Sequence, residues 1–321
     1  MNWSISKAKI FSKCQRKWFY YEIMARKNSK DKDRFEAYIL KQLGSIHAWR
    51  GKIVDQVIEN LLVPEFNKSN VPPFDKIVTF VSVLMKKQLE FAKLRKYRDP
   101  KLTKKKASDS YCALRELEYS ERLDNDSVEK IKEQVIISLK NLLQSELMKT
   151  LLDSDTVLVA QKNLNYKFQE FNIISRPDLI VYFRDEPPMI IDWKVYFFRT
   201  ENARMQLGVY AIALAECIST DPFQKPIDDP TEIRLIEYQL LKNFQRNYKL
   251  TSSDVCTIKD YINISSKDMG KLIINKKYHE FDINQFKMAY TLESCEYCNF
   301  KSLCQNKKVK YQVNLMKFIN D

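Results

Sequence analysis

The chain has 321 residues, with 54 Lys plus Arg against 41 Asp plus Glu, a formal net charge of +13 and only four glycines. Dinucleotide-binding folds and P-loop NTPases need clustered glycines where the backbone approaches phosphate. The four glycines stand apart in the sequence, which excludes both classes. The positive charge favours a polyanionic partner, because Lys and Arg release counterions condensed on nucleic acid. A Lys-rich genome composition would give the same excess.

The N-terminal residues include Lys7, Lys9 and Lys13 and lack the apolar run of a signal peptide. No stretch reaches the roughly 18 apolar residues of a membrane span. We therefore expect a soluble, cytoplasmic protein that does not associate with a membrane. Its seven cysteines are then expected to be thiols or metal ligands instead of disulfides.

The first half of the sequence predicts helices. Residues 16–21 place basic beside aromatic side chains, which fits either contact with a single strand or a buried helix. Helical spacing of apolar residues continues to Leu62, and residues 74–150 read as further helices. The basic stretch 93–106 between them is interpreted either as a solvated loop or as a nucleic-acid contact.

The pattern then changes to short runs rich in β-branched residues. A β-meander is predicted, with a turn at 185–188 before its last strand. A helix over 202–217 and a strand over 233–241 follow, before a less regular C-terminal third. The four predicted strands of the meander cover residues 157–160, 164–168, 173–183 and 189–195.

The meander carries the residues with the clearest chemistry. Asp192 and Lys194 alternate along one strand and so point to the same face. The hairpin at 185–188 should lay Asp178 beside them. Two carboxylates suit a hard divalent cation, and a nearby ammonium could position water or stabilise phosphate charge. The simpler alternative is that Asp178 is a turn residue and that Asp192 and Lys194 form a surface ion pair. A charged residue directly after two isoleucines in a buried strand favours a functional role for Asp192 instead.

The motifs in this region resemble a known family. Arg176-Pro-Asp-Leu, then Ile191-Asp-Trp-Lys, then Gln206-Leu-Gly-Val-Tyr210 is similar to the PD-(D/E)XK nuclease core with its Gln-x-x-x-Tyr signature. The resemblance is to the subgroup of RecB/AddB nuclease domains and CRISPR-adaptation exonucleases. It implies an α/β fold with a restriction-endonuclease-like mixed β-sheet flanked by helices.

The resemblance also implies roles for individual residues. Asp178 and Asp192 would ligate Mg²⁺ or Mn²⁺, together with the main-chain carbonyl of Trp193. Lys194 would orient or activate the attacking water. Gln206 and Tyr210 lie four residues apart, on one helix face, where they would touch substrate or the lysine.

The family carries a further metal ligand, a histidine on an upstream helix. The matching segment, Gly51 to Glu59, has Asp55 at that position. Carboxylate is a competent ligand for either ion, so Asp55 is the favoured candidate and His47 the alternative. Glu59 would be a further ligand, a substrate contact or a salt-bridge partner.

The cysteines form a second pattern. Cys295, Cys298 and Cys304 are closely spaced, and three thiols need a fourth ligand from elsewhere to complete a four-coordinate site. The resemblance selects Cys14, because the named nucleases hold a [4Fe–4S] cluster with one cysteine before the core and three after it. A structural Zn²⁺ is the alternative, since spacing alone does not separate the two.

Together these expectations describe one nuclease domain over residues 1–321, with an Fe–S lid joining both termini. The predicted activity is metal-dependent DNA hydrolysis, as an exonuclease on single strands or ends in CRISPR adaptation, anti-phage defence or recombinational repair. A helicase or other ATPase, or a defence complex, would be the protein partner. The alternative is a catalytically weak or inactive nucleic-acid-binding subunit of such a complex. The predicted segments are an N-terminal Cys and metal-helix segment at 1–62, a helical insertion at 63–153, a catalytic core at 154–245 and a three-Cys region at 246–321.

Overall fold

The structure is a computed structural model. The structure describes residues 1–119, 123–196, 203–217, 221–291 and 293–305. The chain forms two compact units, each assembled from separate segments. The first unit contains residues 1–5, 45–90 and 122–266, and the second contains residues 6–44, 91–121 and 267–321. The predicted insertion at 63–153 therefore contributes residues to both.

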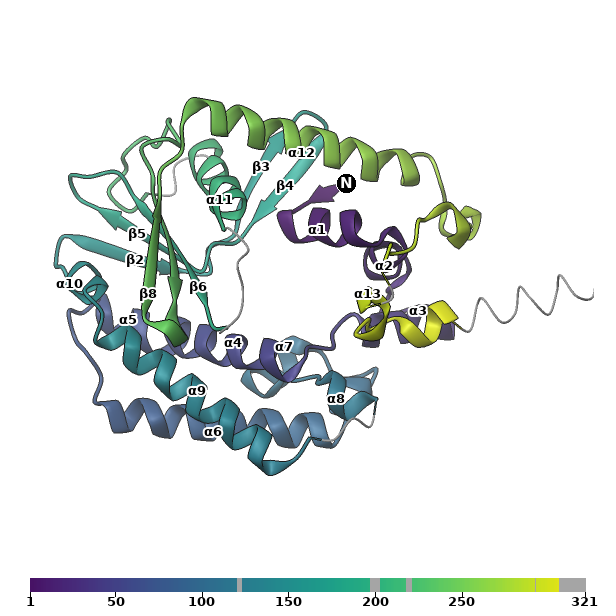
Figure 1. The fold of residues 1–321 in the computed structure, drawn as a ribbon, viewed down its shortest axis with the longest axis horizontal. Helices are drawn as coiled ribbons and strands as arrows, with labels where there is room; N and C mark the ends of the chain where they lie inside the picture. Colours follow the sequence, from purple (N-terminus) through teal and green to yellow (C-terminus); the bar gives the residue numbers. More distant parts are fainter. Residues whose placement is uncertain (120–122, 197–202, 218–220, 292, 306–321) are drawn as a thin grey trace, which may run out of the picture. The chain divides into compact units, whose positions relative to one another are not determined.

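The first unit is built on a five-stranded mixed sheet in the order β2-β5-β6-β7-β8. β6 and β7 run parallel, and the other neighbours are antiparallel. Figure 1 shows α11 near this sheet and α4 and α9 below it. The strands are β2 (Thr156–Ala160), β5 (Leu179–Phe183), β6 (Met189–Lys194), β7 (Arg234–Gln239) and β8 (Phe244–Tyr248).

A second sheet corrects the predicted meander. β4 (Phe171–Ser175) pairs with β3 (Leu164–Phe168) and, in parallel, with β1 (Asn2–Trp3). The expected single strand over 173–183 is wrong: it divides into β4 and β5, which belong to different sheets. Pro177 lies at the break, where its missing N–H cannot contribute to a ladder. β2 consequently pairs with β5 across the inserted hairpin.

Helices of the first unit follow from caps and apolar periodicity. Ser45 accepts a hydrogen bond from the Ala48 N–H at 3.2 Å and begins α4 (Ile46–Val57). Trp49, Ile53 and Val57 of α4 are buried at helical spacing. The remaining elements are a π-helix at Ile58–Leu62, α5 (Val63–Phe66), α6 (Phe74–Lys93), α9 (Asn125–Leu143), α10 (Leu147–Leu151), α11 (Arg204–Glu216), a 3₁₀ turn at Leu240–Lys242 and α12 (Ser252–Ile273), and α6 and α12 continue into the second unit.

The second unit brings segments from both ends of the chain together. Tyr20 stacks on Phe300 with ring centroids 5.5 Å apart, and Phe19 packs on Phe286 at 4.6 Å. Trp18, Phe19 and Tyr20 are all buried. Of the two interpretations of residues 16–21, the buried helix is therefore correct. The helices are α1 (Ile5–Lys13), α2 (Gln15–Trp18), a π-helix at Phe19–Met24, α3 (Lys32–Leu40), α7 (Lys104–Ala107), α8 (Arg115–Glu118) and α13 (Glu293–Glu296), with 3₁₀ turns at Lys96–Arg98, Ser108–Ser110, Tyr278–Glu280 and Ile283–Gln285.

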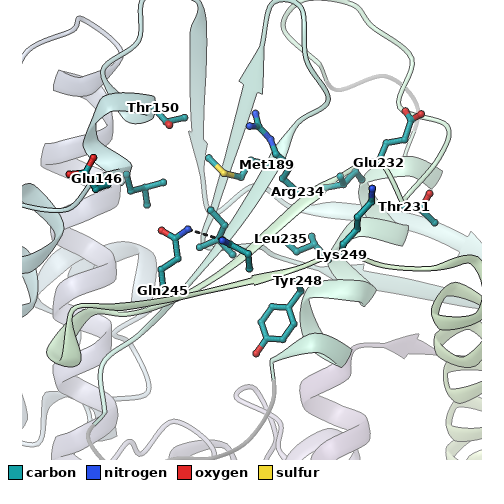
Figure 2. A pocket seen from close by; sticks show the side chains of 14 residues that line it. Glu146, Thr150, Met189, Thr231, Glu232, Arg234, Leu235, Gln245, Tyr248 and Lys249 are labelled. Atoms are coloured by element: carbon teal, nitrogen blue, oxygen red, sulfur yellow. Dashed lines mark hydrogen bonds between the residues drawn. The ribbon is translucent and has the colours of Figure 1, made fainter.

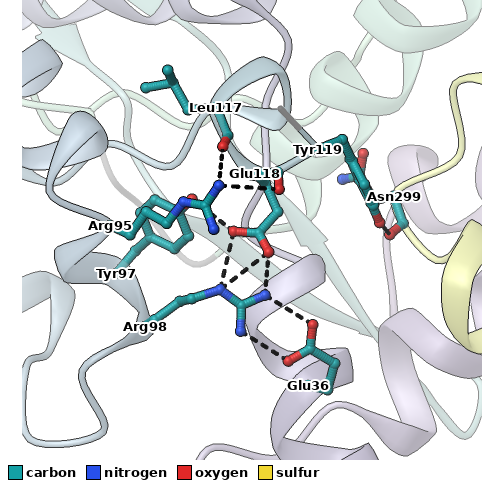
Figure 3. A network of polar contacts seen from close by, with 8 residues as sticks. All are labelled: Glu36, Arg95, Tyr97, Arg98, Leu117, Glu118, Tyr119 and Asn299. Atoms are coloured by element: carbon teal, nitrogen blue, oxygen red, sulfur yellow. Dashed lines mark hydrogen bonds and ion pairs between the residues drawn. The ribbon is translucent and has the colours of Figure 1, made fainter. Parts of the chain in front are cut away.

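An ionic network holds the middle segment of the second unit (Figure 3). The Arg98 guanidinium donates to Glu36 at 2.9 and 3.0 Å and forms several hydrogen bonds with Glu118. Tyr97 also donates to Glu118, at 2.8 Å. Part of the basic stretch 93–106 is thus bound within the protein through Arg98. No helix of the described residues is long and apolar enough to span a membrane.

Candidate active site

Three acidic side chains meet at the carboxyl end of β6. Leu179 of β5 lies opposite Ile191 of β6, which sets Asp178 beside Asp192 at the next position. Asp178 accepts a hydrogen bond from the Trp193 N–H at 2.9 Å. Asp192 itself is only 1% exposed. The predicted hairpin therefore brings the two aspartates together.

Asp55 joins them from α4. Burial, and then the charge of Asp192, raise the pKa of Asp55 to about 7 against the opposing effect of Lys194. The pKa of Asp178 is also raised well above its usual range, by burial first and then by Asp192 and Asp55. Each carboxylate therefore disfavours ionisation of the others, as expected for like charges in a buried site.

Lys194 is the basic group of this cluster. Its ammonium forms an ion pair with the Asp192 carboxylate. Burial lowers the pKa of Lys194, but the neighbouring Asp192 and Asp178 outweigh that effect and leave it above the usual value. One ammonium faces three carboxylates, so the site has an excess of oxygen ligands and negative charge. That donor set fits a hard divalent cation.

Helix α11 contributes two more predicted residues. The Gln206 amide donates to Asp192 at 2.9 Å and to the Tyr210 hydroxyl at 2.8 Å. Both residues come from adjacent turns of one helix face, as their spacing predicts. Burial, followed by the charge of Asp192, raises the pKa of Tyr210, so its hydroxyl stays protonated.

The other predicted ligands are placed as follows. Trp193 contributes its backbone, while its side chain is buried and packs edge-on against Tyr238 at 6.1 Å. His47 is exposed and lies about two turns, roughly 12 Å, before Asp55 on α4. Glu59 forms an ion pair with Arg176 at 3.7 Å. The helix thus brings Asp55 to the carboxylates and leaves His47 outside them.

Sequence reasoning missed Glu237, which is completely buried on β7. In the parallel ladder Asp192 lies directly beside Glu237, so both side chains share one face of the sheet. Glu237 accepts a hydrogen bond from Tyr248 at 2.8 Å and faces Arg246 at 3.7 Å. The signal that selected Asp192, an acid inside an apolar strand, is also present at Ile236-Glu237-Tyr238.

Arg50 was also missed, and it connects α4 to β6. Its guanidinium donates to the Val195 carbonyl, just past β6, and to the side chain of Gln134. The residue is 4% exposed. Because Arg50 lies little more than one helical turn before Asp55, this contact fixes the helix relative to the strand. No motif indicated it, since an arginine in a helix is usually solvated.

The four predicted cluster cysteines all belong to the second unit. Burial raises the pKa of the Cys298 thiol, with smaller contributions from Cys14 and Cys304. Cys295 is exposed. The charges of Cys14 and Cys304 therefore act on the Cys298 thiol, and thiols are the donors that Fe–S and zinc sites use. Within the described residues, no three His, Cys, Asp or Glu side chains are already arranged to hold a metal ion, which applies to these cysteines and to Asp55, Asp178 and Asp192 alike.

Comparison with protein families matches residues 2–305 to the PD-(D/E)XK nuclease superfamily. The chain belongs to this superfamily, whose members are generally metal-dependent nucleases that use Mg²⁺ or Mn²⁺. The mixed sheet flanked by helices agrees with that assignment. A search of curated proteins gives no match.

Proposed function

We propose that the protein is a divalent-metal-dependent DNA exonuclease, related to the RecB/AddB and CRISPR-adaptation nucleases, that acts on single strands or DNA ends. The main support is the buried group of Asp55, Asp178 and Asp192 with one ammonium, Lys194, among them. Clustered carboxylates that raise one another's pKa are typical of sites built for a function. The setting would be cytoplasmic defence or recombinational repair, with a helicase, another ATPase or a defence complex as partner.

The three aspartates would hold Mg²⁺ or Mn²⁺, with the Trp193 carbonyl as a further ligand. The ion would polarise the scissile phosphate and activate water when bound. Lys194 would then turn from Asp192 to orient the attacking water. Gln206 would keep Asp192 in place, since it already donates to that carboxylate, and Tyr210 would orient Gln206.

Cleavage of end-labelled single and double strands tests the proposal. Wild-type protein should degrade DNA only with Mg²⁺ or Mn²⁺, and Lys194→Ala should abolish cleavage while DNA binding survives. Lys225→Ala is a matched control, because Lys225 forms an exposed ion pair in the same unit. DNA binding without cleavage under either ion would instead favour the inactive binding subunit, for which Asp55 in the usual histidine position is the supporting observation.

We also propose that Cys14, Cys295, Cys298 and Cys304 hold a [4Fe–4S] cluster. The supporting observations are the spacing of the cysteines and the placement of all four in the second unit, where the charges of Cys14 and Cys304 act on Cys298. Anaerobically purified wild-type protein should contain iron and sulfide, and Cys14→Ser should lose both. Cys256→Ser, at an exposed cysteine of the first unit, should retain them. Zinc in place of iron would contradict the cluster and identify the alternative.

A further inference from the structure

Strand β8 presents a distinct set of side chains on the face that carries the candidate active site. Gln239 of β7 lies beside Lys194 of β6 and opposite Phe244 of β8. In the same way, Glu237 of β7 lies between Asp192 of β6 and Arg246 of β8. Two strand spacings separate β6 from β8, so these rows place Phe244 and Arg246 about 10 Å from the candidate catalytic groups.

The two faces of β8 differ in chemistry. Phe244, Arg246 and Tyr248 point to the face of Asp192, whereas Gln245 and Asn247 point to the other. The second face borders a cavity of about 470 Å³, lined in part by Glu146, Met189 and Gln245 (Figure 2). The Phe244 and Arg246 side chains therefore lie on the face that the aspartates share, and Gln245 and Asn247 lie on the face of the cavity.

Phe244 is exposed, and the half-buried Arg246 lies next to it. The Phe244 side chain is 48% exposed. The Arg246 guanidinium lies 5.4 Å from the centre of its ring. An exposed aromatic ring beside a cation offers one face to a planar group and a positive charge next to it. Stacking of a base on the ring with a cation near the phosphate is a common way to hold single-stranded nucleic acid.

This pair of side chains is also held rigidly. Tyr238 donates to the Asn243 side chain at 2.6 Å, and Asn141 of α9 donates to the Leu240 carbonyl at 2.7 Å. Both contacts fix the turn that leads into Phe244. Arg246 is oriented by Glu237, which Tyr248 holds from the same strand. A site fixed before binding loses less conformational entropy when it binds.

We propose that Phe244 and Arg246 bind one unpaired nucleotide of the substrate strand, with the base stacked on the Phe244 ring and the neighbouring phosphate beside the Arg246 guanidinium. The inference rests on the proposed nuclease function, and it names the substrate class as an unpaired strand. A base within a duplex is stacked and paired on both sides, so its face is not available to the ring. Phe244 is therefore a selector for single strands.

The test measures binding separately from cleavage. Full-length protein is titrated into labelled oligonucleotides in buffer with Ca²⁺, and binding is followed by fluorescence anisotropy. Each oligonucleotide carries one abasic site, and its position moves stepwise along the strand from one oligonucleotide to the next. Wild-type protein should lose about five- to tenfold in affinity at one abasic position. Phe244→Leu should bind the intact strand correspondingly weakly and show no further loss at that position. Phe244→Trp should restore the position-dependent loss.

Phe74→Leu is the matched control, because Phe74 is an exposed phenylalanine at the start of α6. It should bind like wild type at every position. Arg246→Gln should reduce the slope of log K against log salt by about one phosphate contact. An identical abasic profile for wild type and Phe244→Leu would overturn the proposal. Failure of the nuclease function is a separate result, namely absence of cleavage in Mg²⁺ or Mn²⁺ with the abasic profile retained.

Discussion

Two groups of buried or half-buried carboxylates in this protein have pKa values that are shifted in opposite directions. In the first unit, Asp55 and Asp178 have raised pKa values, because burial and neighbouring carboxylates outweigh the effect of Lys194. In the second unit, burial also acts on Glu118, but hydrogen bonds from Arg98 and Tyr97 lower its pKa overall. Both groups are made of acids brought together from distant parts of the sequence.

The difference lies in the cation that each group receives. Arg98 presents a planar fork that bonds to two carboxylates at once, so its own pKa is raised and the network is satisfied. Lys194 is a single point charge shared among three aspartates. Acids balanced by arginine stabilise a fold, whereas acids left in excess favour an added cation. The comparison therefore separates a structural cluster from a candidate metal site by charge balance alone.

The largest expected effect is on cleavage by Asp192→Asn. Removing one carboxylate from the metal-binding set should lower the cleavage rate on the order of 10³-fold. The substitution also removes the ion pair with Lys194 while it relieves repulsion from Asp55 and Asp178, so folding stability in chelator reports the balance of these two effects. End-labelled DNA cleavage and thermal unfolding measure the two effects. Asp185→Asn, at an exposed ion pair in the same unit, should keep full activity.

The second effect is stabilisation by the ion itself. An ion bound at about 100 times its dissociation constant should add about 2.7 kcal/mol to the folded state. Thermal unfolding with increasing Mn²⁺ should show this in wild type and lose it in Asp192→Asn. Arg98→Gln should keep the Mn²⁺-dependent increase. Equal increases in wild type and Asp192→Asn would place the ion elsewhere.

The third effect is on the stability of the arginine network. Arg98→Gln leaves Glu36 and Glu118 without their cation and should cost about 2 kcal/mol in the free energy of unfolding. Arg184→Gln is the control, because Arg184 pairs with Asp155 at the surface. That change should cost less than about 0.5 kcal/mol. Chemical denaturation followed by circular dichroism gives both values, and a cost for Arg98→Gln no larger than that for Arg184→Gln would contradict a stabilising role for the Arg98 network.

The smallest effect is on the pH dependence of folding stability, which should have opposite signs for Asp55 and Glu118. For Asp55, the folded pKa of about 7 exceeds the unfolded value, so the folded state binds more protons and loses stability as pH rises from about 4 to 7. Asp55→Asn should therefore be more stabilising at pH 7 than at pH 4 in chelator. For Glu118, the folded pKa is depressed, so its contribution is present above the unfolded value near 4.5 and is lost as pH falls below it.

Unfolding free energies of Asp55→Asn and Glu118→Gln, measured against wild type across that range, check the two signs. The Glu118→Gln variant should be less stable than wild type at neutral pH and approach it in acid. Parallel pH profiles for the two variants would contradict the comparison.

Local patterns in the sequence were enough to predict much of the candidate site. Alternation set Asp192 and Lys194 on one face, and four-residue spacing set Gln206 and Tyr210 on another. The turn at 185–188 correctly predicted the pairing of β5 and β6. What could not be predicted was the neighbour of β6 on its other side: β7 arrives from beyond α11 and places Glu237 beside Asp192.

The two aromatic–basic segments show the same limit. Residues 16–21 and 244–248 both contain aromatic and basic side chains, and a nucleic-acid contact was predicted from the sequence only for the first segment. Packing decided the outcome, because Trp18, Phe19 and Tyr20 are buried while Phe244 is exposed. Composition does not distinguish a ring in the core from a ring in water.

By itself the sequence determined the order of the motifs, the hairpin with its two aspartates, the helix with its glutamine and tyrosine, and the superfamily. The tertiary structure decided that Asp55 and not His47 reaches the carboxylates, that one strand divides at Pro177 between two sheets, and that Glu237 extends the acidic row. The physical reason is the separation in sequence over which each interaction acts. Helical and strand periodicities act between residues a few positions apart, whereas burial and strand order depend on contacts between distant segments.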